Sequence, residues 1–167
     1  MKTDASFAGL VQAFFTDRLL RQRRASPHTI AGYRDTFRLL LRFAKERLGK
    51  APSKLSLEDL DAAFVGDFLD HLEEGRGNGA RSRNTRLAAL HSFFHYVSFQ
   101  EPAYADQCRR ILAIPSKRYE RRLIEYLTTE EIDALLAAPD RTTWIGRRDR
   151  ALLLVGVQTG LRVSCSP

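Results

Sequence analysis

The chain has 167 residues, which is enough for one ordinary domain, or for one small domain and part of another. Hydrophobic residues make up 44% of the chain, a share that supports a packed core and excludes wholesale disorder. With 27 lysine and arginine against 20 aspartate and glutamate residues, the formal net charge is +7, which suits a polyanionic partner, nucleic acid before a membrane surface, and equally a merely soluble basic protein.

Two helices are predicted at the N-terminal end. Apolar residues recur at helical spacing from Phe7 to about Arg24, where the first helix ends in a cluster of arginines. Ser26 and Pro27 are typical of an N-cap and a first helical position, so a second helix is predicted from there to about Leu48. Its predicted apolar stripe consists of Ile30, Tyr33, Phe37, Leu40, Leu41, Ala44 and Leu48.

Another face of the second helix is basic. Acidic residues at (i, i+4) spacing do not neutralise most of this ridge, as they would on a solvent face laced with salt bridges. Such a ridge is a solvated surface in most proteins, but it also suits a helix that lies along a phosphate backbone. We expect it to contact DNA through Arg34, Arg38, Arg42 and Lys45.

A third, acidic helix is predicted to begin at Ser56, because Asp59 follows three residues later as in a capping signature. Residues 55–74 contain seven acidic residues and no lysine or arginine. Paired acids could form a metal or acid–base site, but we interpret them as a solvated face that points away from DNA. The predicted apolar stripe is Leu57, Leu60, Phe64, Phe68 and Leu72.

A glycine-rich turn at residues 75–79 precedes a fourth helix, whose core side is Leu87, Leu90, Phe94 and Val97. Backbone donors, hydroxyls and arginines at the start of this helix suit contacts with phosphates and base edges. His91 and His95 lie one turn apart, as zinc ligands can, but no cysteine or acidic residue lies at a matching distance. We interpret the two histidines as packing or DNA-facing residues. The basic start of the helix contains Arg81, Ser82, Arg83, Asn84, Thr85 and Arg86.

Residues 101–126 are expected to form a basic connector, which is either a plain interdomain linker or a segment that follows a DNA backbone. Its basic residues are Lys117, Arg118, Arg121 and Arg122. Thr128 and Glu131 then predict a capping box at the start of a further helix. A last, buried helix is predicted to end at Gly160 in a positive-φ turn, which would hold Arg162 in a position that suits phosphate binding. Most arginines near helix ends, however, are solvated or cap carbonyl groups.

Cysteine usage and hydropathy indicate the compartment. Cys108 and Cys165 have neither metal-ligand spacing nor a secretory context, so we expect free thiols in a reducing cytosol. Residues 1–4 are not followed by the apolar segment of a signal peptide. The apolar run after Arg150 is far shorter than the roughly 20 residues of a membrane-spanning helix. We therefore expect a cytoplasmic protein without a membrane partner, nucleoid-associated through its expected DNA contacts.

The last two predicted helices contain three motifs in a fixed order, namely Leu127-Thr128-Thr129-Glu130-Glu131, Arg148-Asp149-Arg150-Ala151-Leu152-Leu153 and Thr159-Gly160-Leu161-Arg162-Val163-Ser164. In order and spacing these motifs resemble the opening of the catalytic domain of tyrosine recombinases, the phage-integrase family. Residues 7–100 resemble the N-terminal core-binding domain of the same family. The matching segments there are Ser26-Pro27-His28-Thr29-Ile30 with Tyr33-Arg34, and Arg83-Asn84-Thr85-Arg86-Leu87 with Leu90 and Phe93-Phe94.

The resemblance implies an all-α protein with a four-helix, SAM-like core-binding domain at residues 1–100, a basic linker at 101–126 and a two-helix piece of the catalytic domain at 127–167. Double-stranded DNA and other recombinase protomers are the implied partners. In the family a tyrosine attacks the scissile phosphate without metal or cofactor, and arginines stabilise the transition state. Arg162 would be the first catalytic arginine. The expected DNA contacts are Ser26, His28, Thr29, Arg34, Arg38, Arg42, Arg81, Arg83, Asn84, Arg86, Lys117 and Arg118.

The sequence departs from the family pattern near its end. The family places the remaining catalytic groups, including the nucleophilic tyrosine, after the first arginine, whereas all five tyrosines here precede Arg162. An acidic residue and a leucine usually follow Ser164, but this chain has Cys165-Ser166-Pro167. We expect a truncated or frameshifted recombinase that binds DNA without cleaving it. We also expect residues from about 127 onward to be loosely ordered or paired with another chain, because two helices cannot close a core.

Two alternatives stay open. A helical transcription regulator would need two short helices joined by a tight turn of three or four residues, and the pattern shows no such pair. A helical interaction protein without a nucleic-acid role would make the basic faces of the second and fourth helices accidental.

Overall fold

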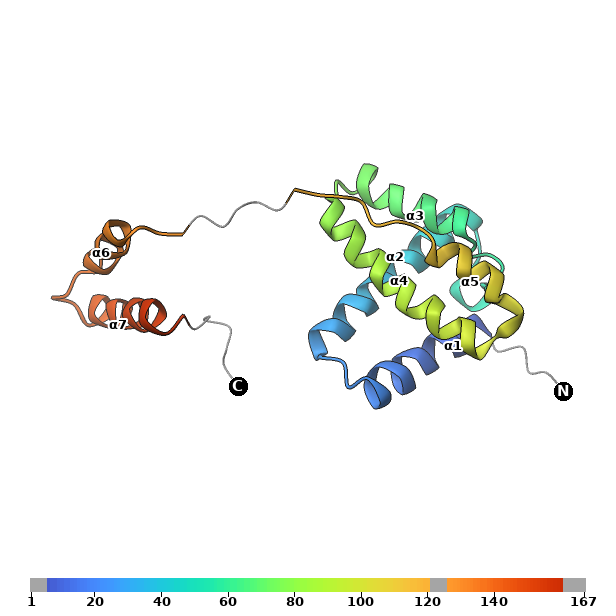
Figure 1. The fold of residues 1–167 in the computed structure, drawn as a ribbon, viewed down its shortest axis with the longest axis horizontal. Helices are drawn as coiled ribbons and strands as arrows, with labels where there is room; N and C mark the ends of the chain where they lie inside the picture. Colours follow the sequence, from blue (N-terminus) through green and yellow to red (C-terminus); the bar gives the residue numbers. More distant parts are fainter. Residues whose placement is uncertain (1–5, 121–125, 161–167) are drawn as a thin grey trace. The chain divides into compact units, whose positions relative to one another are not determined.

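The computed structural model describes residues 6–120 and 126–160, and every regular element within these ranges is helical. This confirms the all-α prediction. The chain divides into two compact units, residues 1–120 and 121–167 (Figure 1). The first contains α1 (Phe7–Ala13), a π-helix (Phe14–Gln22), α2 (Pro27–Leu48), a 3-10 turn (Pro52–Lys54), α3 (Ala62–Glu74), α4 (Ala80–Gln100), a second 3-10 turn (Pro102–Tyr104) and α5 (Ala105–Leu112). The second contains α6 (Thr129–Ala137) and α7 (Trp144–Thr159).

The first predicted helix is present but changes type at Phe14, where α1 continues as a π-helix. Residues five apart lie close to one face of a π-helix, and Phe14 and Leu19 are both fully buried. The start of α2 is as predicted: Ser26 is the N-cap, its Oγ accepts a hydrogen bond from the Thr29 amide at 3.2 Å, and Pro27 is the first helical residue. The helix ends at Gly49, whose φ of 63° is favourable for glycine.

The predicted start of the third helix at Ser56 is wrong. The helix α3 begins at Ala62, and its N-cap is Asp61, whose carboxylate accepts from the Phe64 amide at 2.7 Å. Asp59 instead closes a turn, since its Oδ2 accepts from the amide and the hydroxyl of Ser56 at 3.0 and 3.1 Å. The same short carboxylate-to-amide pattern serves turns and helix starts, so spacing alone did not distinguish them.

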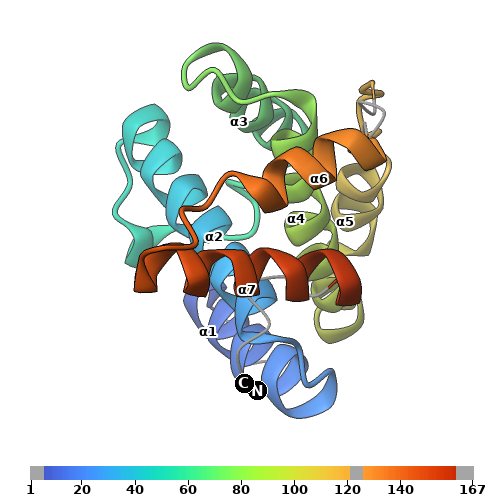
Figure 2. The same ribbon diagram turned by 90° about the vertical axis from the view of Figure 1, so that its left-hand side faces the viewer.

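The core of the first unit is aromatic and is organised around α4, which contacts α2, α3 and α5 (Figures 1 and 2). The ring of Phe93 on α4 lies 5.1 Å from that of Phe37 on α2 and 5.4 Å from that of Phe14. The predicted core residues of α4 are all buried, as are those of α3 and its preceding turn. Edge-to-face pairs of this kind add to the hydrophobic gain from burial.

The expected connector contains a helix. Residues 102–112 form the second 3-10 turn and α5, which packs along α4 and buries Cys108 and Ile111. The side-chain amide of Gln107 donates to the carbonyl oxygens of Leu57 and Leu60 at 2.5 and 3.1 Å. The first unit therefore reaches beyond Gln100, because this short amphipathic segment completes its core.

The second unit confirms two local predictions. Thr128 and Glu131 form a reciprocal capping box at the start of α6, and α7 ends at Gly160 with a φ of 64°. The expectation that the last helix is buried is wrong within the described residues, because Trp144, Leu152 and Val155 are 67%, 65% and 51% exposed. This exposure agrees with the expectation that two helices cannot close a core of their own. None of the helices described has the length and apolarity needed to cross a membrane.

Candidate nucleic-acid interface

The exposed face of α2 presents a row of guanidinium groups. Arg34 and Arg42 are exposed, and no carboxylate in the described part of the chain lies within 4.0 Å of either guanidinium. Arg38 lies between them, with 70% of its side chain exposed, and donates to Asp35 at 2.7 Å. The predicted ridge therefore lies on the surface, and two of its three arginines have charges that no nearby acid balances.

The start of α2 extends this surface. The side chain of Ser26 is used for capping and lies 3.0 Å from the hydroxyl of Thr29, while His28 is exposed on the first turn. The first amides of a helix lack intrahelical acceptors and point toward any anion placed there. Arg24, which precedes the cap, has a φ of 45°, a conformation that non-glycine residues rarely adopt. The hydroxyls and the imidazole thus lie beside a helix end that favours negative charge.

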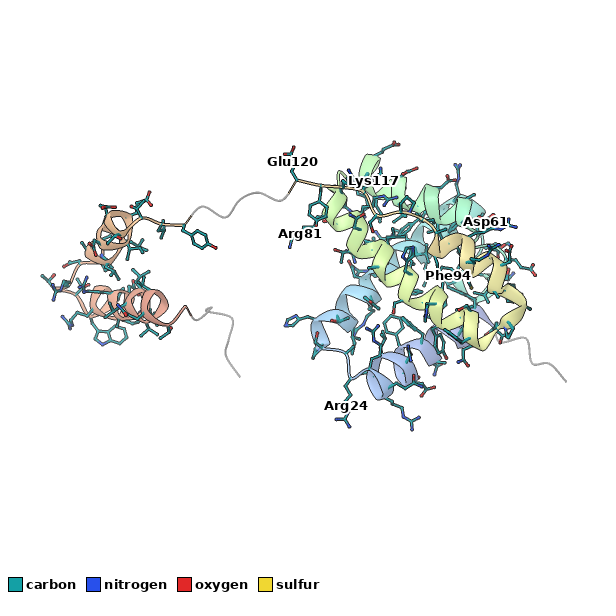
Figure 3. All side chains as sticks on the ribbon, in the orientation of Figure 1. Arg24, Asp61, Arg81, Phe94, Lys117 and Glu120 are labelled. Atoms are coloured by element: carbon teal, nitrogen blue, oxygen red, sulfur yellow. The ribbon has the colours of Figure 1, made fainter. Side chains whose placement is uncertain are left out.

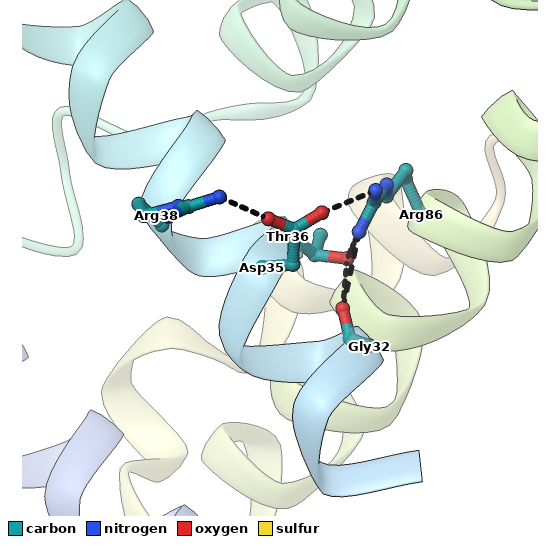
Figure 4. Close-up of polar contacts among 5 residues, drawn as sticks. All are labelled: Gly32, Asp35, Thr36, Arg38 and Arg86. Carbon is teal, nitrogen blue, oxygen red and sulfur yellow. Dashed lines mark hydrogen bonds and ion pairs between the residues drawn. The ribbon is translucent and has the colours of Figure 1, made fainter. Parts of the chain in front are cut away.

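Arg86 connects α4 to α2 instead of pointing to solvent (Figure 4). Its Nη2 donates to Oδ2 of Asp35 at 2.5 Å, and its Nη1 donates to the Gly32 carbonyl at 3.1 Å and to the Thr36 hydroxyl at 3.2 Å. Only 21% of its side chain is exposed. We conclude that Arg86 holds the two basic helices in a fixed relation.

The same contacts set the charge of Asp35. Its partial burial raises the pKa of Asp35, but hydrogen bonds and the positive charges of Arg86 and Arg38 outweigh that effect, so the pKa lies below its ordinary range. Asp35 is therefore ionised at neutral pH. It neutralises part of the charge of Arg38 and Arg86, which leaves Arg34, Arg42 and Lys45 as the unbalanced charges of this face among the described residues.

At the start of α4, only part of the predicted contact set faces solvent. Arg81 is exposed and has no carboxylate within 4.0 Å among the described residues. Arg83 is 5% exposed; its Nη1 donates to the Pro115 carbonyl at 3.4 Å, and its Nε lies 3.5 Å from Glu73 without hydrogen-bond geometry. Its guanidinium makes intramolecular contacts in this structure and does not reach the surface.

Asn84 and Lys117 are also engaged within the first unit. The side-chain Nδ2 of Asn84 donates to the Lys117 carbonyl at 2.7 Å, and its Oδ1 accepts from the Lys117 backbone amide at 2.9 Å. The ammonium of Lys117 lies 2.5 Å from Glu73, although 49% of the Lys117 side chain is exposed. Figure 3 labels Lys117 and Arg81 at this end of α4. Arg118 is exposed, whereas Arg121, Arg122 and the predicted catalytic Arg162 lie outside the described residues.

The two histidines of α4 differ in surroundings. The Nε2 of His91 lies 3.1 Å from the Ile111 carbonyl, and burial lowers the pKa of His91. His95 is exposed, and its ring lies 5.1 Å from that of Phe99. Within residues 6–120 and 126–160, no group of three or more histidine, cysteine and acidic side chains could hold a metal ion. The position of His91 supports its interpretation as a packing residue.

Sequence reasoning missed two acidic residues that organise this surface, Asp35 and Glu73. Asp35 lies three residues before Arg38 on the predicted basic helix, a spacing at which ion pairs form, so the pattern contained a signal for it. Glu73 contacts Arg83, which lies beyond a glycine-rich turn, and Lys117, which lies much later in the chain. No local sequence pattern indicates contacts between residues so far apart.

Comparison with known proteins places these observations in context. The family described as phage integrase, N-terminal SAM-like domain, matches residues 12–100. The predicted integrase/recombinase y4rC of Sinorhizobium fredii is 58% identical over 164 residues, which cover 98% of this chain and 49% of that protein. The predicted integrase/recombinase y4rD of the same organism is 48% identical over 157 residues, which cover 94% of this chain and 56% of that protein.

A tyrosine recombinase, XerC of Pelotomaculum thermopropionicum, is 33% identical over 144 residues, which cover 86% of this chain and 45% of that protein. The chain thus spans about half the length of the curated relatives it matches. No solved structure matches it.

Proposed function

The chain belongs to the phage integrase family of tyrosine recombinases, and from this premise we propose that its first unit binds double-stranded DNA as the core-binding part of a site-specific recombinase. The observation that carries the proposal is the surface row of arginines without acidic partners on α2 and at the start of α4. Arginines of this kind release counterions from DNA when they contact phosphates, which is a main source of affinity.

The contacting groups are those that the first unit exposes. Arg34, Arg42 and Arg81 supply unbalanced charge, and Arg38 adds a charge that Asp35 partly neutralises. The first turn of α2 supplies polar groups and backbone donors through Ser26, His28 and Thr29, and Arg118 adds a further cation. Phosphate contacts of this type position a protein on the duplex, and groups that reach base edges give sequence preference.

Four predicted contact residues have a supporting part in this proposal. Arg86 ties α4 to α2 through Asp35, so the two basic helices present their arginines with a constant spacing. Arg83 and Asn84, in the first turns of α4, make intramolecular contacts: Asn84 bonds to the backbone of Lys117, and Arg83 and Lys117 both lie beside Glu73. Lys117 is 49% exposed and can still contact a phosphate. We expect that contact to be weaker than those of the arginines, because the Lys117 ammonium already pairs with Glu73.

The second unit corresponds to the opening of the catalytic domain, with Arg162 as the first arginine that would stabilise the transition state. All five tyrosines of the sequence precede Arg162. A polypeptide of these 167 residues is therefore proposed to bind DNA without forming a covalent phosphotyrosyl adduct. Strand cleavage and rejoining would need groups that the family places after this arginine.

Charge-neutralised variants test the interface. The triple variant Arg34→Gln, Arg42→Gln, Arg81→Gln should weaken duplex binding. The negative slope of log affinity against log salt concentration should become shallower by roughly 2–3, or roughly 1 for each phosphate contact removed. The measurement is fluorescence anisotropy with a labelled duplex over a salt series. Arg109→Gln is the control, because Arg109 is also exposed, on α5, but pairs with Asp106. Equal affinities for the triple variant and this control would favour a helical interaction module over a DNA-binding domain.

A further inference from the structure

After α5 the chain turns back and passes beside the start of α4. Ile114 packs against the core, and the next residues lie within hydrogen-bond distance of α4. There Asn84 makes two hydrogen bonds to one residue, donating to the Lys117 carbonyl at 2.7 Å and accepting from the Lys117 amide at 2.9 Å. A carboxamide has the donor and acceptor of a peptide group, so Asn84 satisfies both backbone groups of Lys117 as a neighbouring strand would.

Charged groups reinforce this contact. The half-buried carboxylate of Glu73, at the end of α3, lies 2.5 Å from the Lys117 ammonium and 3.5 Å from Nε of the buried Arg83. Arg83 in turn donates to the Pro115 carbonyl at 3.4 Å and to Asn84 at 3.4 Å. Residues from α3, α4 and the segment after α5 therefore meet at one place. We call Glu73, Arg83, Asn84 and Lys117 the exit clamp.

We propose that the exit clamp fixes the point at which the chain leaves the first unit, and that Asn84 is its positioning residue. The helix α5 ends at Leu112, and the next helix has its N-cap at Thr128. Chain held only as far as Ile114, which packs against the core, could span at most roughly 45–50 Å before Thr128, whereas chain held at Lys117 can span at most roughly 35–40 Å. The clamp thus shortens the stretch of free chain that follows the first unit.

The choice of side chain supports this role. An aspartate at position 84 could accept from the Lys117 amide but could not donate to its carbonyl, and an alanine could do neither. The clamp also holds Lys117 at the end of α4 that carries Arg81 (Figure 3), and the exposed Arg118 is the next residue of the chain. The inference goes beyond the proposed function, because these contacts are intramolecular and exist without DNA.

Hydrogen exchange of the Lys117 amide tests the clamp directly in the full chain without DNA. The wild-type amide should be protected, and Asn84→Ala should lower its protection by about tenfold or more, because it removes both bonds that hold the residue. Asn84→Asp keeps the acceptor and should retain most of the protection. Thr85→Ala is the matched control, because the Thr85 hydroxyl bonds only within α4, to the Arg81 carbonyl.

A second readout is the rate of trypsin cleavage after Lys117, which should rise in Asn84→Ala while the thermal unfolding temperature of the first unit stays close to that of wild type. An unprotected Lys117 amide in the wild-type chain would overturn the proposal. Equal loss of protection in Asn84→Ala and Thr85→Ala would also overturn it, since it would indicate fraying of α4 and not release of a clamp. Neither outcome depends on whether the chain binds DNA.

Discussion

Individual arginines of the first unit fall into two groups that net charge does not distinguish. Arg34, Arg42 and Arg81 are exposed and have no acidic partner among the described residues. Arg83 and Arg86 are largely buried, and each lies close to a carboxylate. All five were predicted to contact DNA from their residue type and position. Helical periodicity placed Arg34 and Arg42 on a solvent face. It did not identify Arg83 and Arg86 as internal, because their partners come from distant elements.

Replacing Arg86 should destabilise the fold. Arg86→Ala removes three hydrogen bonds, those to the Asp35 carboxylate, the Thr36 hydroxyl and the Gly32 carbonyl, so we expect the free energy of unfolding to fall by about 1–3 kcal/mol. Urea unfolding monitored by circular dichroism measures this change. Arg81→Ala, on the exposed start of the same helix, is the control and should change stability by less than about 0.5 kcal/mol. Equal effects of the two substitutions would contradict the structural role of Arg86.

Carboxylates with lowered pKa values should make the first unit less stable in acid. The hydrogen bond from Lys50, with those from Ser56, holds the pKa of Asp59 below its ordinary range. A lowered pKa contributes stability above the ordinary value, and that contribution is lost as the pH falls through the folded-state pKa. Asp59→Asn should therefore reduce stability at pH 7 more than at pH 3, as measured by urea unfolding. Asp70→Asn, at an exposed position on α3, is the control; a pH-independent effect of Asp59→Asn would contradict the prediction.

Among the helices, α1, α2, α4, α6 and α7 were predicted from their sequence signals, whereas the start of α3 and the whole of α5 show where such signals fail. The caps at Ser26 and Thr128 are local patterns, and the structure confirms both. Asp59 satisfies the same capping pattern inside a turn, and α5 is too short for its periodicity to distinguish it from a linker. Tertiary packing determines whether such a short segment is helical. Burial of Cys108 and Ile111 stabilises α5, which would be only marginally stable as an isolated helix.

Replacing Ile111 tests whether α5 belongs to the folded first unit. The side chain of Ile111 is fully buried, so Ile111→Ala should lower the free energy of unfolding by about 2–4 kcal/mol. Thermal or urea unfolding of the full chain measures it. Arg110→Ala, at a neighbouring exposed position, should have a much smaller effect. A negligible effect of Ile111→Ala would mean that residues 101–126 act as a plain linker after all.

Across the whole molecule, the two units differ in how completely they bury their apolar residues. The first has an aromatic core formed by residues from all of its main helices, whereas α7 exposes Trp144, Leu152 and Val155. Sequence patterning indicates which face of a helix is apolar but not what covers it, since that depends on contacts with elements elsewhere. The apolar pattern of α7 therefore predicted a buried helix, but no other described element covers these side chains.

The central proposal is that a basic surface on the first unit binds duplex DNA and that these 167 residues bind it without cleaving it. The most direct measurement is the affinity of the wild-type chain for duplex DNA over a salt series, with a denaturing gel of the same mixtures. We expect affinity to fall steeply with salt, with a slope of roughly −3 or steeper if at least three phosphates are contacted, and no covalent adduct on the gel. Absence of binding at low salt would contradict the proposed DNA binding, and an adduct that survives denaturation would contradict the proposal that these 167 residues form no phosphotyrosyl link.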